Sequence, residues 1–458
     1  MKIPLLVPEI REYLAENNTE ELKDFCESSP PALVADFLSA LQPEEAWRVL
    51  QTTSPQLRAE IFTYLEADLQ REIIEKLPRD QLARLFFDMS ADDRVDLFKS
   101  LPEDRREMIL PALAQAERED IRKLSSFPEG TAGAVMTSDY ATLPPDITAA
   151  EAINKLRREA PDRETIYYAY VVDANRRLIG FVSLKDLILA PPDVKVEKIM
   201  HREVVSVCVN DDQEEAAQKI QKYDLIALPV TSPEGILMGI ITHDDALDVI
   251  TQEHTEDIEK LMAIAGSHQA GVYLQMSAWE HFRNRVGWIV ALALLGLVSG
   301  YIVQTYEGLI LQFGILASFM PMLADTGGNT GSQSATLVIR ALALKEISVR
   351  DALKIVWKEF KVSFSLALVL AVVAFGRVII FARNSVPANY SLWWIGLAVS
   401  TALGLQVITA TLLGALLPLV AVSFGHDPAV IASPALTTIV DITGLLIYFA
   451  TVKCFLWH

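Results

Sequence analysis

The sequence predicts a multidomain chain with four parts in order. These are an all-α superhelical N domain (residues 1–130), a tandem pair of α/β repeats (131–250), a connecting helix (251–282) and a five-span α-helical membrane domain (283–458). Three observations predict this organisation. Helix-start signals recur every 12 residues in the first part, one α/β pattern occurs twice in the second, and long uncharged apolar stretches fill the last.

Charge divides the chain in the same way. Residues 1–280 hold 29 Lys and Arg against 52 Asp and Glu, a net charge of −23, whereas residues 281–458 hold 11 against 7, a net charge of +4; the two sum to the −19 of the whole chain. The acidic part repels nucleic acid and attracts cations. We therefore expect cations and a lipid bilayer as partners, and no nucleic acid.

The three cysteines are far apart in the sequence, at Cys26, Cys208 and Cys454, and show no metal-ligand spacing. This usage predicts no disulfide framework and a reducing compartment for the acidic part.

The helical array is predicted from punctuation in the first 130 residues. A residue followed shortly by Pro, Ser or Asp recurs every 12 positions, at Leu41, Thr53, Leu65, Leu77, Met89 and Leu101. Pro and acidic residues favour the first turn of a helix. One short helix cannot bury its apolar face alone, so we expect a stack. Asp92 and Asp96 are four residues apart and share a helix face, which suits either a solvated helix start or a metal site.

The second part repeats itself. IGFVSLKDLI (179–188) matches MGIITHDDAL (238–247), and each copy predicts a strand, a helix, a β-hairpin and a second helix. These two copies resemble paired CBS domains. The resemblance implies an adenosine ligand or an ion as the molecule sensed.

In CBS pairs that bind nucleotide, a Ser or Thr with an Asp three residues later contacts the ligand. Ser183 with Asp186, and Thr242 with Asp245, have this spacing. The resemblance therefore implies ATP as a candidate regulatory ligand at these residues.

Five membrane spans are predicted from uncharged apolar stretches of sufficient length. They lie at 286–305, 308–339, 362–382, 391–424 and 428–456. The fourth is uncharged for 34 residues, so we expect it to be long and tilted or broken at Gly404 or Gly414. The loop at 340–361 carries six Lys and Arg, which places this loop and the acidic N-terminal part in the cytosol.

The last span has a carboxylate near its middle. Thirteen uncharged residues precede Asp441 and eleven follow it before Lys453. A charge at this depth costs about 2.5–3.5 kcal/mol, so it normally faces a cavity, a pore or a partner. One interpretation pairs Asp441 with a basic residue of a neighbouring helix, for which Arg377 is the candidate. The other makes it a cation site in a conduction path.

A second polar stretch lies in the second span, at PMLADTGGNTGSQSAT (321–336). Its glycines and small hydroxyl residues allow close helix packing, and Asn329, Gln333 and Thr336 share one face. The stretch is therefore either a packing seam or a polar wall that stands opposite Asp441.

A family resemblance is carried by the stretches TGGNTGSQSATLVIRAL, TEDIEKL and DITGLL. The whole chain resembles the MgtE family of bacterial magnesium channels. This resemblance implies a homodimer with its pore at the subunit interface, in the bacterial plasma membrane as a multi-pass protein with a cytoplasmic N-terminus. It implies Mg²⁺ at Asp441, with the backbone near Thr437 and the side chain of Asn329 assisting.

The resemblance also implies regulatory Mg²⁺ between acidic faces of the cytosolic part. The matching positions are Glu60, Asp92, Asp96, Asp212, Glu214, Asp224, Asp245, Asp248, Glu256, Asp257 and Asp427. The function expected is Mg²⁺ influx down the electrochemical gradient, gated by intracellular Mg²⁺. Two alternatives stay open: an ion-coupled secondary transporter of divalent cations, and a non-transporting membrane sensor. An enzyme is not expected, because no nucleophile–base pair or phosphate-binding loop is present.

Overall fold

The structure is a computed structural model that describes residues 7–160, 163–266, 273, 276–381, 390–428 and 433–456. The chain divides into two compact units, residues 1–251 (the N-terminal unit) and 252–458 (the C-terminal unit), and each is described by itself.

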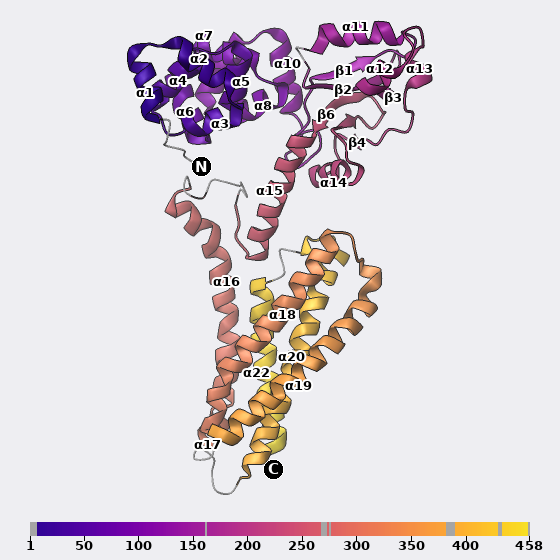
Figure 1. The fold of residues 1–458 in the computed structure, drawn as a ribbon. Coiled ribbons are helices and arrows are strands. Elements are labelled where there is room, and N and C mark those ends of the chain that lie inside the picture. Colours follow the sequence, from indigo (N-terminus) through magenta and orange to yellow (C-terminus); the bar gives the residue numbers. More distant parts are fainter. Residues whose placement is uncertain are drawn as a thin grey trace. The chain divides into compact units, whose positions relative to one another are not determined.

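The N-terminal unit begins with a helical array, drawn in indigo and purple in Figure 1. Its helices are α1 (Val7–Glu16), α2 (Thr19–Ser28), α3 (Pro31–Leu38), α4 (Pro43–Leu50), α5 (Pro55–Thr63), α6 (Ala67–Lys76), α7 (Arg79–Asp88), α8 (Ala91–Ser100), α9 (Glu103–Ile109) and α10 (Gln115–Leu124). From α4 to α9 each helix starts 12 residues after the one before, which confirms the predicted repeat.

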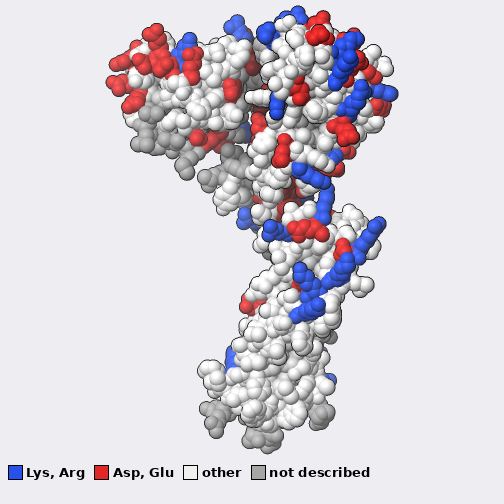
Figure 2. Space-filling view, turned by 45° about the vertical axis from the view of Figure 1, so that its right-hand side comes forward, with Lys and Arg blue, Asp and Glu red and all other residues white. Residues whose placement is uncertain are grey.

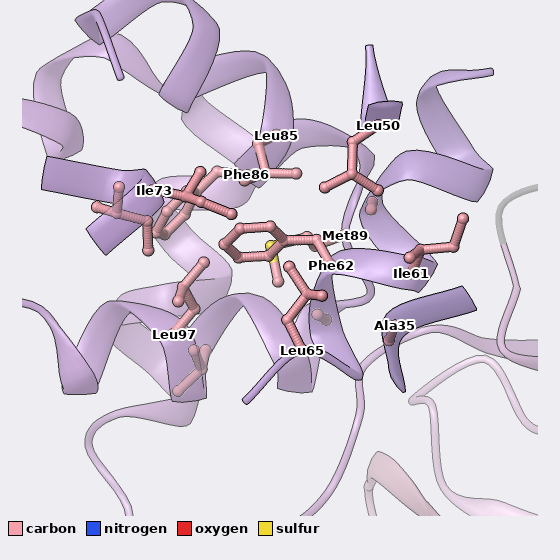
Figure 3. Close-up of a cluster of buried hydrophobic side chains, with 14 of the residues drawn as sticks. Ala35, Leu50, Ile61, Phe62, Leu65, Ile73, Leu85, Phe86, Met89 and Leu97 are labelled. Carbon is pink, nitrogen blue, oxygen red and sulfur yellow. The ribbon is translucent and has the colours of Figure 1, made fainter. Parts of the chain in front are cut away.

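Alternate helices of the array pack on one another. One row places α3 on α5, α5 on α7 and α7 on α9, while α4 packs on α6 and α8 on α10. The predicted punctuation residues are all buried, from Leu41 to Leu101. Phe62 and Phe86 are fully buried and meet apolar side chains from several helices in the core shown in Figure 3. Two rows of helices sharing one core are the predicted superhelical arrangement.

The α/β repeats follow, and the predicted element order is confirmed. The first repeat contains β1 (Tyr140–Leu143), α11 (Ala149–Glu159), β2 (Thr165–Val172), β3 (Leu178–Ser183) and α12 (Leu184–Leu189). After the short α13 (Val196–Ile199), the second contains β4 (Val207–Cys208), α14 (Gln213–Tyr223), β5 (Ala227–Thr231), β6 (Leu237–Thr242) and α15 (His243–Leu261). Each sheet has three strands in the order β1-β2-β3 or β4-β5-β6, with the first pair parallel and the second antiparallel.

The two repeats exchange their opening segments. Thr137 pairs with Ile240 of β6, and His201 pairs with Phe181 of β3, in each case through two backbone hydrogen bonds of 2.8 and 3.0 Å. The repeat glycines allow this approach, because a Cβ on Gly239 would lie 2.7 Å from the Met136 sulfur. The two CBS-like repeats are therefore joined to each other across their sheets.

The connecting helix differs from its prediction. A helix over 251–282 is expected, but α15 begins at His243 within the second repeat and ends at Leu261. Ala263 and Gly266 then adopt positive φ values of 55° and 124°, which stop the helix. The next helix, α16 (Ala278–Thr305), starts at a Ser277 capping box.

The C-terminal unit continues with α17 (Glu307–Gln312), α18 (Met320–Ala343), α19 (Ala352–Phe381), α20 (Leu392–Ser423) and α22 (Ser433–Leu456). Four helices of the described segments are long and apolar enough to cross a membrane: α16, α19, α20 and α22. With α18, which is 24 residues long but polar, they correspond to the five predicted spans. Figure 2 shows a largely uncharged surface here, with Lys and Arg gathered toward one end.

Three spans depart from their predicted form. The second is not one helix over 308–339, because α17 and a 3₁₀ turn at Gly314–Phe319 precede α18, whose first turn contains Pro321. The third starts at Ala352, ten residues earlier than predicted, so the expected loop is partly helical. The fourth is continuous through Gly404 and Gly414, and not broken there.

Candidate functional site

A polar stripe runs along α18 of the C-terminal unit. Asp325, Asn329, Gln333 and Thr336 are all exposed, and their spacing puts them on one helix face, as predicted for the last three. The Asn329 amide donates to Asp325 at 3.2 Å. Four exposed polar side chains on a helix of membrane-spanning length need water, an ion or another polar surface beside them.

The last helix, α22, lies against the same segment of α18. A Cβ on Gly328 would lie 3.4 Å from the Thr437 methyl group, and one on Gly327 would lie 2.9 Å from Val440. The two polar stretches singled out from the sequence therefore meet, with Thr437 and Asp441 on α22 at the level of the glycines next to Asn329.

Among the described residues, Asp441 has no arginine partner. Arg377 donates to the Ser318 carbonyl at 3.1 Å and lies over the Phe319 ring at 4.3 Å, so the alternative that paired it with Asp441 is wrong. One Asp441 oxygen, Oδ1, is buried and has no hydrogen-bond partner among the described residues. An unpartnered carboxylate oxygen inside a membrane domain is a ready cation ligand.

Sequence reasoning missed Gln406, a polar residue in the middle of α20. It is fully buried, and its amide nitrogen donates to the Val440 carbonyl at 3.0 Å. The predicted fourth span was characterised only by its lack of charge. A single amide in a 34-residue uncharged stretch was the signal that could have drawn attention to it.

The N-terminal unit holds a second candidate site, an acidic cleft of about 570 Å³. Eight acidic residues line it, and they come from the helical array, the segment before β2 and the start of α15. Its described lining includes no Lys or Arg. The acids are Glu60, Asp88, Asp92, Asp93, Glu164, Asp244, Asp245 and Asp248. A wall of one sign concentrates cations.

Two helix starts form this acidic cleft. Asp92 and Asp93 lie in the first turn of α8, whose first N–H, on Ala91, donates to the Asp139 carboxylate of the first repeat at 3.1 Å. Asp244 and Asp245 lie in the first turn of α15. Helix N-termini favour carboxylates, which explains how so many acids tolerate one another.

Burial raises the pKa of five of these acids, Asp88, Asp93, Glu164, Asp245 and Asp248. Burial, with the neighbouring Asp92 charge, raises the pKa of Asp245 from 3.8 to about 7. The same two causes raise the pKa of Asp93 to about 6. Asp92 Oδ1 is buried and has no hydrogen-bond partner in the part of the chain that the structure describes. Within the described segments no group of three or more acidic, His or Cys side chains is arranged as a metal centre.

The structure sorts the predicted cytosolic residues. Glu60, Asp92, Asp245 and Asp248 line the cleft, whereas Asp96 is exposed on α8 and is not among the lining residues. Sequence reasoning missed Asp88, Asp93, Glu164 and Asp244, because nothing in the pattern brings Glu164 from the first repeat to α8.

Three further predicted ligands lie at the ends of α14, outside the cleft. Asp212 is the N-cap of α14 and accepts from the Glu214 N–H at 2.7 Å, while Asp224 ends the helix in a left-handed conformation. The Glu214 carboxylate accepts from Gln218 at 2.8 Å. Asp212 and Asp224 therefore cap α14, and the ligand role predicted for all three residues stays a prediction.

The proposed nucleotide residues are also helix caps. Ser183 and Asp186 form a reciprocal capping box at α12, and His201 contacts Asp186 at 3.1 Å. The buried Thr242 hydroxyl donates to Asp245 at the start of α15. The two pairs thus share a structural role that matches the internal repeat.

The remaining predicted ligands meet in the C-terminal unit around Lys260. Its ammonium lies 2.5 Å from Glu256 and 3.0 Å from Asp427. Asp257 is near Asp427, and burial with this neighbouring charge raises the Asp257 pKa.

Taken together, a helical array, paired CBS-like repeats and a membrane domain with a central carboxylate define a multi-pass membrane transport protein with acidic N-terminal domains. Comparison with known proteins agrees. Family models match at residues 29–130 (MgtE intracellular N domain), 132–193 and 196–252 (CBS domain) and 320–451 (MgtE, divalent cation transporter). The chain belongs to the MgtE family of divalent cation transporters, and it is not an enzyme.

Individual relatives are similar over long stretches. The magnesium transporter MgtE of Thermus thermophilus is 40% identical over 344 residues, which are 74% of this chain and 73% of that protein. The crystal structure of the soluble part of a magnesium transporter has a TM-score of 0.52 and 31% identity, covering 54% of this chain and 97% of its own. The crystal structure of the cytosolic domain of the Mg²⁺ channel MgtE in complex with ATP has a TM-score of 0.49 and 36% identity. The match covers 52% of this chain and 98% of that one.

Proposed function

We propose that this protein carries Mg²⁺ into the cell down its electrochemical gradient, along a path that passes Asp441. The observation that carries the proposal is the buried, unpartnered Oδ1 of Asp441 beside the polar stripe of α18. Mg²⁺ loses its waters reluctantly, so a path with one carboxylate and several amide or carbonyl acceptors suits a largely hydrated ion. A divalent ion gains about 4.6 kcal/mol per 100 mV of inside-negative potential, which needs no hydrolysis of ATP.

The path is completed by a second copy of the chain. Asp325, Asn329, Gln333 and Thr336 face outward from α18 in the single chain. A two-fold axis beside this stripe would place it opposite its own copy and enclose a polar channel. The same axis would bring two Asp441 carboxylates to one ion, which supplies the charge that one subunit lacks.

The acidic cleft gives the cytosolic part a means of sensing Mg²⁺. Ions bound between α8 and α15 would offset the repulsion among Asp92, Asp93 and Asp245 and favour the closed arrangement of the unit. When Mg²⁺ is scarce, the carboxylates repel one another and the unit loosens. In this scheme the cation that is transported also limits its own entry.

ATP at the CBS-like pair is a separate part of the proposal. Its support is the matched pairs Ser183–Asp186 and Thr242–Asp245, each at a helix start where backbone N–H groups also favour phosphate. Nucleotide bound there would act on the same repeats that contribute Asp244 and Asp245 to the cleft.

The experiment is Mg²⁺ uptake into vesicles that contain the purified full-length protein. Asp441→Asn keeps the size of the side chain and removes its charge, and we expect uptake to fall to background. Asp351→Asn is the matched control, because Asp351 is part of a capping box before α19, away from the proposed path. Uptake through Asp441→Asn at the normal rate would overturn the pore assignment.

The same vesicles distinguish the two rival functions. Flux that requires a proton or Na⁺ gradient would indicate a coupled secondary transporter. Absence of any divalent cation flux, with binding to the N-terminal unit intact, would indicate a membrane sensor.

A further inference from the structure

The amide of Gln406 occupies an unusual place for a polar group. It is fully buried in the middle of α20, where it contacts both α18 and α22. Its nitrogen donates to the Val440 carbonyl at 3.0 Å, while its oxygen, Oε1, has no hydrogen-bond partner in the described part of the chain. An amide that is only partly satisfied in a membrane interior is costly, so simple space filling would be served better by an apolar side chain.

Two glycines make room for this amide, one from each neighbouring helix. A Cβ on Gly327 of α18 would lie 2.5 Å from the Gln406 nitrogen, and a Cβ on Gly444 of α22 would lie 2.5 Å from its amide carbon. Both distances are below van der Waals contact, so a side chain at either position would require the buried Gln406 amide or one of the helices to move. Gly327 precedes Asn329 by two residues, and Gly444 follows Asp441 by three.

The contact between α18 and α20 is made directly by backbone. Gly414 of α20 faces Gly331 of α18, and a Cβ there would lie 2.9 Å from the Gly331 carbonyl carbon. The spacing of these two helices is therefore set by their glycines. Between α20 and the segment of α22 that carries Asp441, by contrast, the Gln406 side chain is interposed, and it donates to the carbonyl of Val440, immediately before Asp441.

We infer that Gln406 is a positioning residue for the cation path: it acts as a spacer with a hydrogen-bond anchor that fixes α22, and so Asp441, against α18 and Asn329. The inference rests on the proposed function, since it concerns the placement of the proposed cation ligand. The amide touches no ion itself and acts through the Val440 carbonyl and the two glycines.

The spacer predicts a specific compensation between residues on different helices. Gly444→Ala adds a methyl group that collides with the Gln406 amide, so either the amide leaves the Val440 carbonyl or α22 shifts, and uptake of Mg²⁺ should fall at least about tenfold. Gln406→Asn retracts the amide by one methylene. At saturating Mg²⁺ the double variant Gly444→Ala/Gln406→Asn should therefore recover uptake to within about threefold of the wild type, although its amide no longer reaches the Val440 carbonyl; independent sites do not show such a coupling.

The hydrogen bond is tested separately from the volume. Gln406→Met keeps the length of the side chain but cannot donate to Val440, and we expect a higher Mg²⁺ concentration for half-maximal uptake. Gly404→Ala is the control on the same helix, because a Cβ there lies 3.7 Å from Ala367, an ordinary contact. This variant should transport normally.

The experiment measures Mg²⁺ uptake and yield of folded protein for all variants in parallel with Asp441→Asn. Rescue of either uptake or folding of Gly444→Ala by Gln406→Asn supports the spacer. A double variant no better than Gly444→Ala, or Gln406→Met with wild-type uptake and half-saturation, overturns it. If Asp441→Asn itself transports normally, the proposed pore fails, and this outcome is distinct from failure of the spacer alone.

Discussion

The Lys260 ammonium lies 3.0 Å from the Asp427 carboxylate and 2.5 Å from Glu256, one turn earlier on α15. A single side-chain cation thus joins the end of α15 to the segment before the last span. Burial alone would lower the pKa of Lys260, but its hydrogen bonds to these two carboxylates raise it above the usual value. Lys260 therefore stays charged between these acids.

Removing this cation tests whether it holds α15 in place. Lys260→Gln leaves Glu256, Asp257 and Asp427 to repel one another, so we expect backbone hydrogen exchange at residues 256–261 to speed up about fivefold at low Mg²⁺, since such ion pairs contribute up to about 1 kcal/mol. High Mg²⁺ should abolish the difference by bridging the carboxylates.

The control for this substitution is Lys354→Gln, which removes an exposed pair with Asp351. Equal exchange rates in Lys260→Gln and the wild type at low Mg²⁺ would contradict the role of Lys260.

Adjacent phenylalanines test the core of the helical array. Phe86 is fully buried in the cluster of Figure 3, whereas Phe87 is 63% exposed. Phe86→Ala should lower the free energy of unfolding of the N-terminal domains by about 3–5 kcal/mol, and Phe87→Ala should change it by less than about 0.5 kcal/mol. Denaturant unfolding of the purified protein measures both. Similar losses from the two substitutions would show that the array does not share this core.

The 12-residue repeat explains how much of the array the sequence could predict. Helix starts recur at Pro43, Pro55 and Ala67 because local signals, a Pro or an acid after a buried residue, determine each one. Element order in the CBS-like repeats is predictable for the same reason. The two-residue alternation of strands and the 12-residue spacing of helix starts are determined locally, so the structure shows them where the sequence predicts them.

The acidic cleft and the Gln406 contact depend on information that local patterns lack. Glu164 reaches the cleft because two repeats and a helical array pack together, and no spacing in the sequence records this packing. Asp212 and Asp224, by contrast, lie at the two ends of α14 and outside the cleft, a placement that their spacing in the sequence does not reveal. Gln406 becomes informative only when Gly327 and Gly444 are seen on either side of its amide.

The repeat also supplies a matched pair for testing Mg²⁺ sensing. Asp92 and Asp104 occupy the same position in successive helices, α8 and α9, but only Asp92 lines the cleft. We expect Mg²⁺ to slow proteolysis of the N-terminal unit in the wild type and in Asp104→Asn. In Asp92→Asn this protection should need severalfold more Mg²⁺, because a carboxylate facing the ion is lost. Identical Mg²⁺ requirements in both variants would argue against sensing at the cleft.

Protons should stabilise the N-terminal unit in part as Mg²⁺ does, because both reduce the repulsion among the carboxylates of the cleft. The pKa of Asp245 is about 7 in the folded protein against 3.8 for an ordinary Asp, so the folded state binds more protons than the unfolded state between these values. The contribution to stability is complete below about pH 4 and is lost as the pH rises through about 7. Without Mg²⁺, thermal unfolding of the N-terminal unit should therefore occur at higher temperature at about pH 5.5 than at about pH 8.

Asp186 is the matched control for this pH dependence, because it holds the equivalent place in the first repeat but has its pKa lowered. Burial opposes this shift, and the hydrogen bonds from Ser183 outweigh it. Its contribution is lost only as the pH falls below about 3.8, outside the measured window. Asp245→Asn should thus flatten the change in unfolding temperature between the two pH values, and Asp186→Asn should leave it intact. A flat profile in the wild type would mean that the cleft carboxylates do not titrate in this range.

Mg²⁺ should stabilise the unit more at about pH 8 than at about pH 5.5, because protons compete with the ion for the same oxygens.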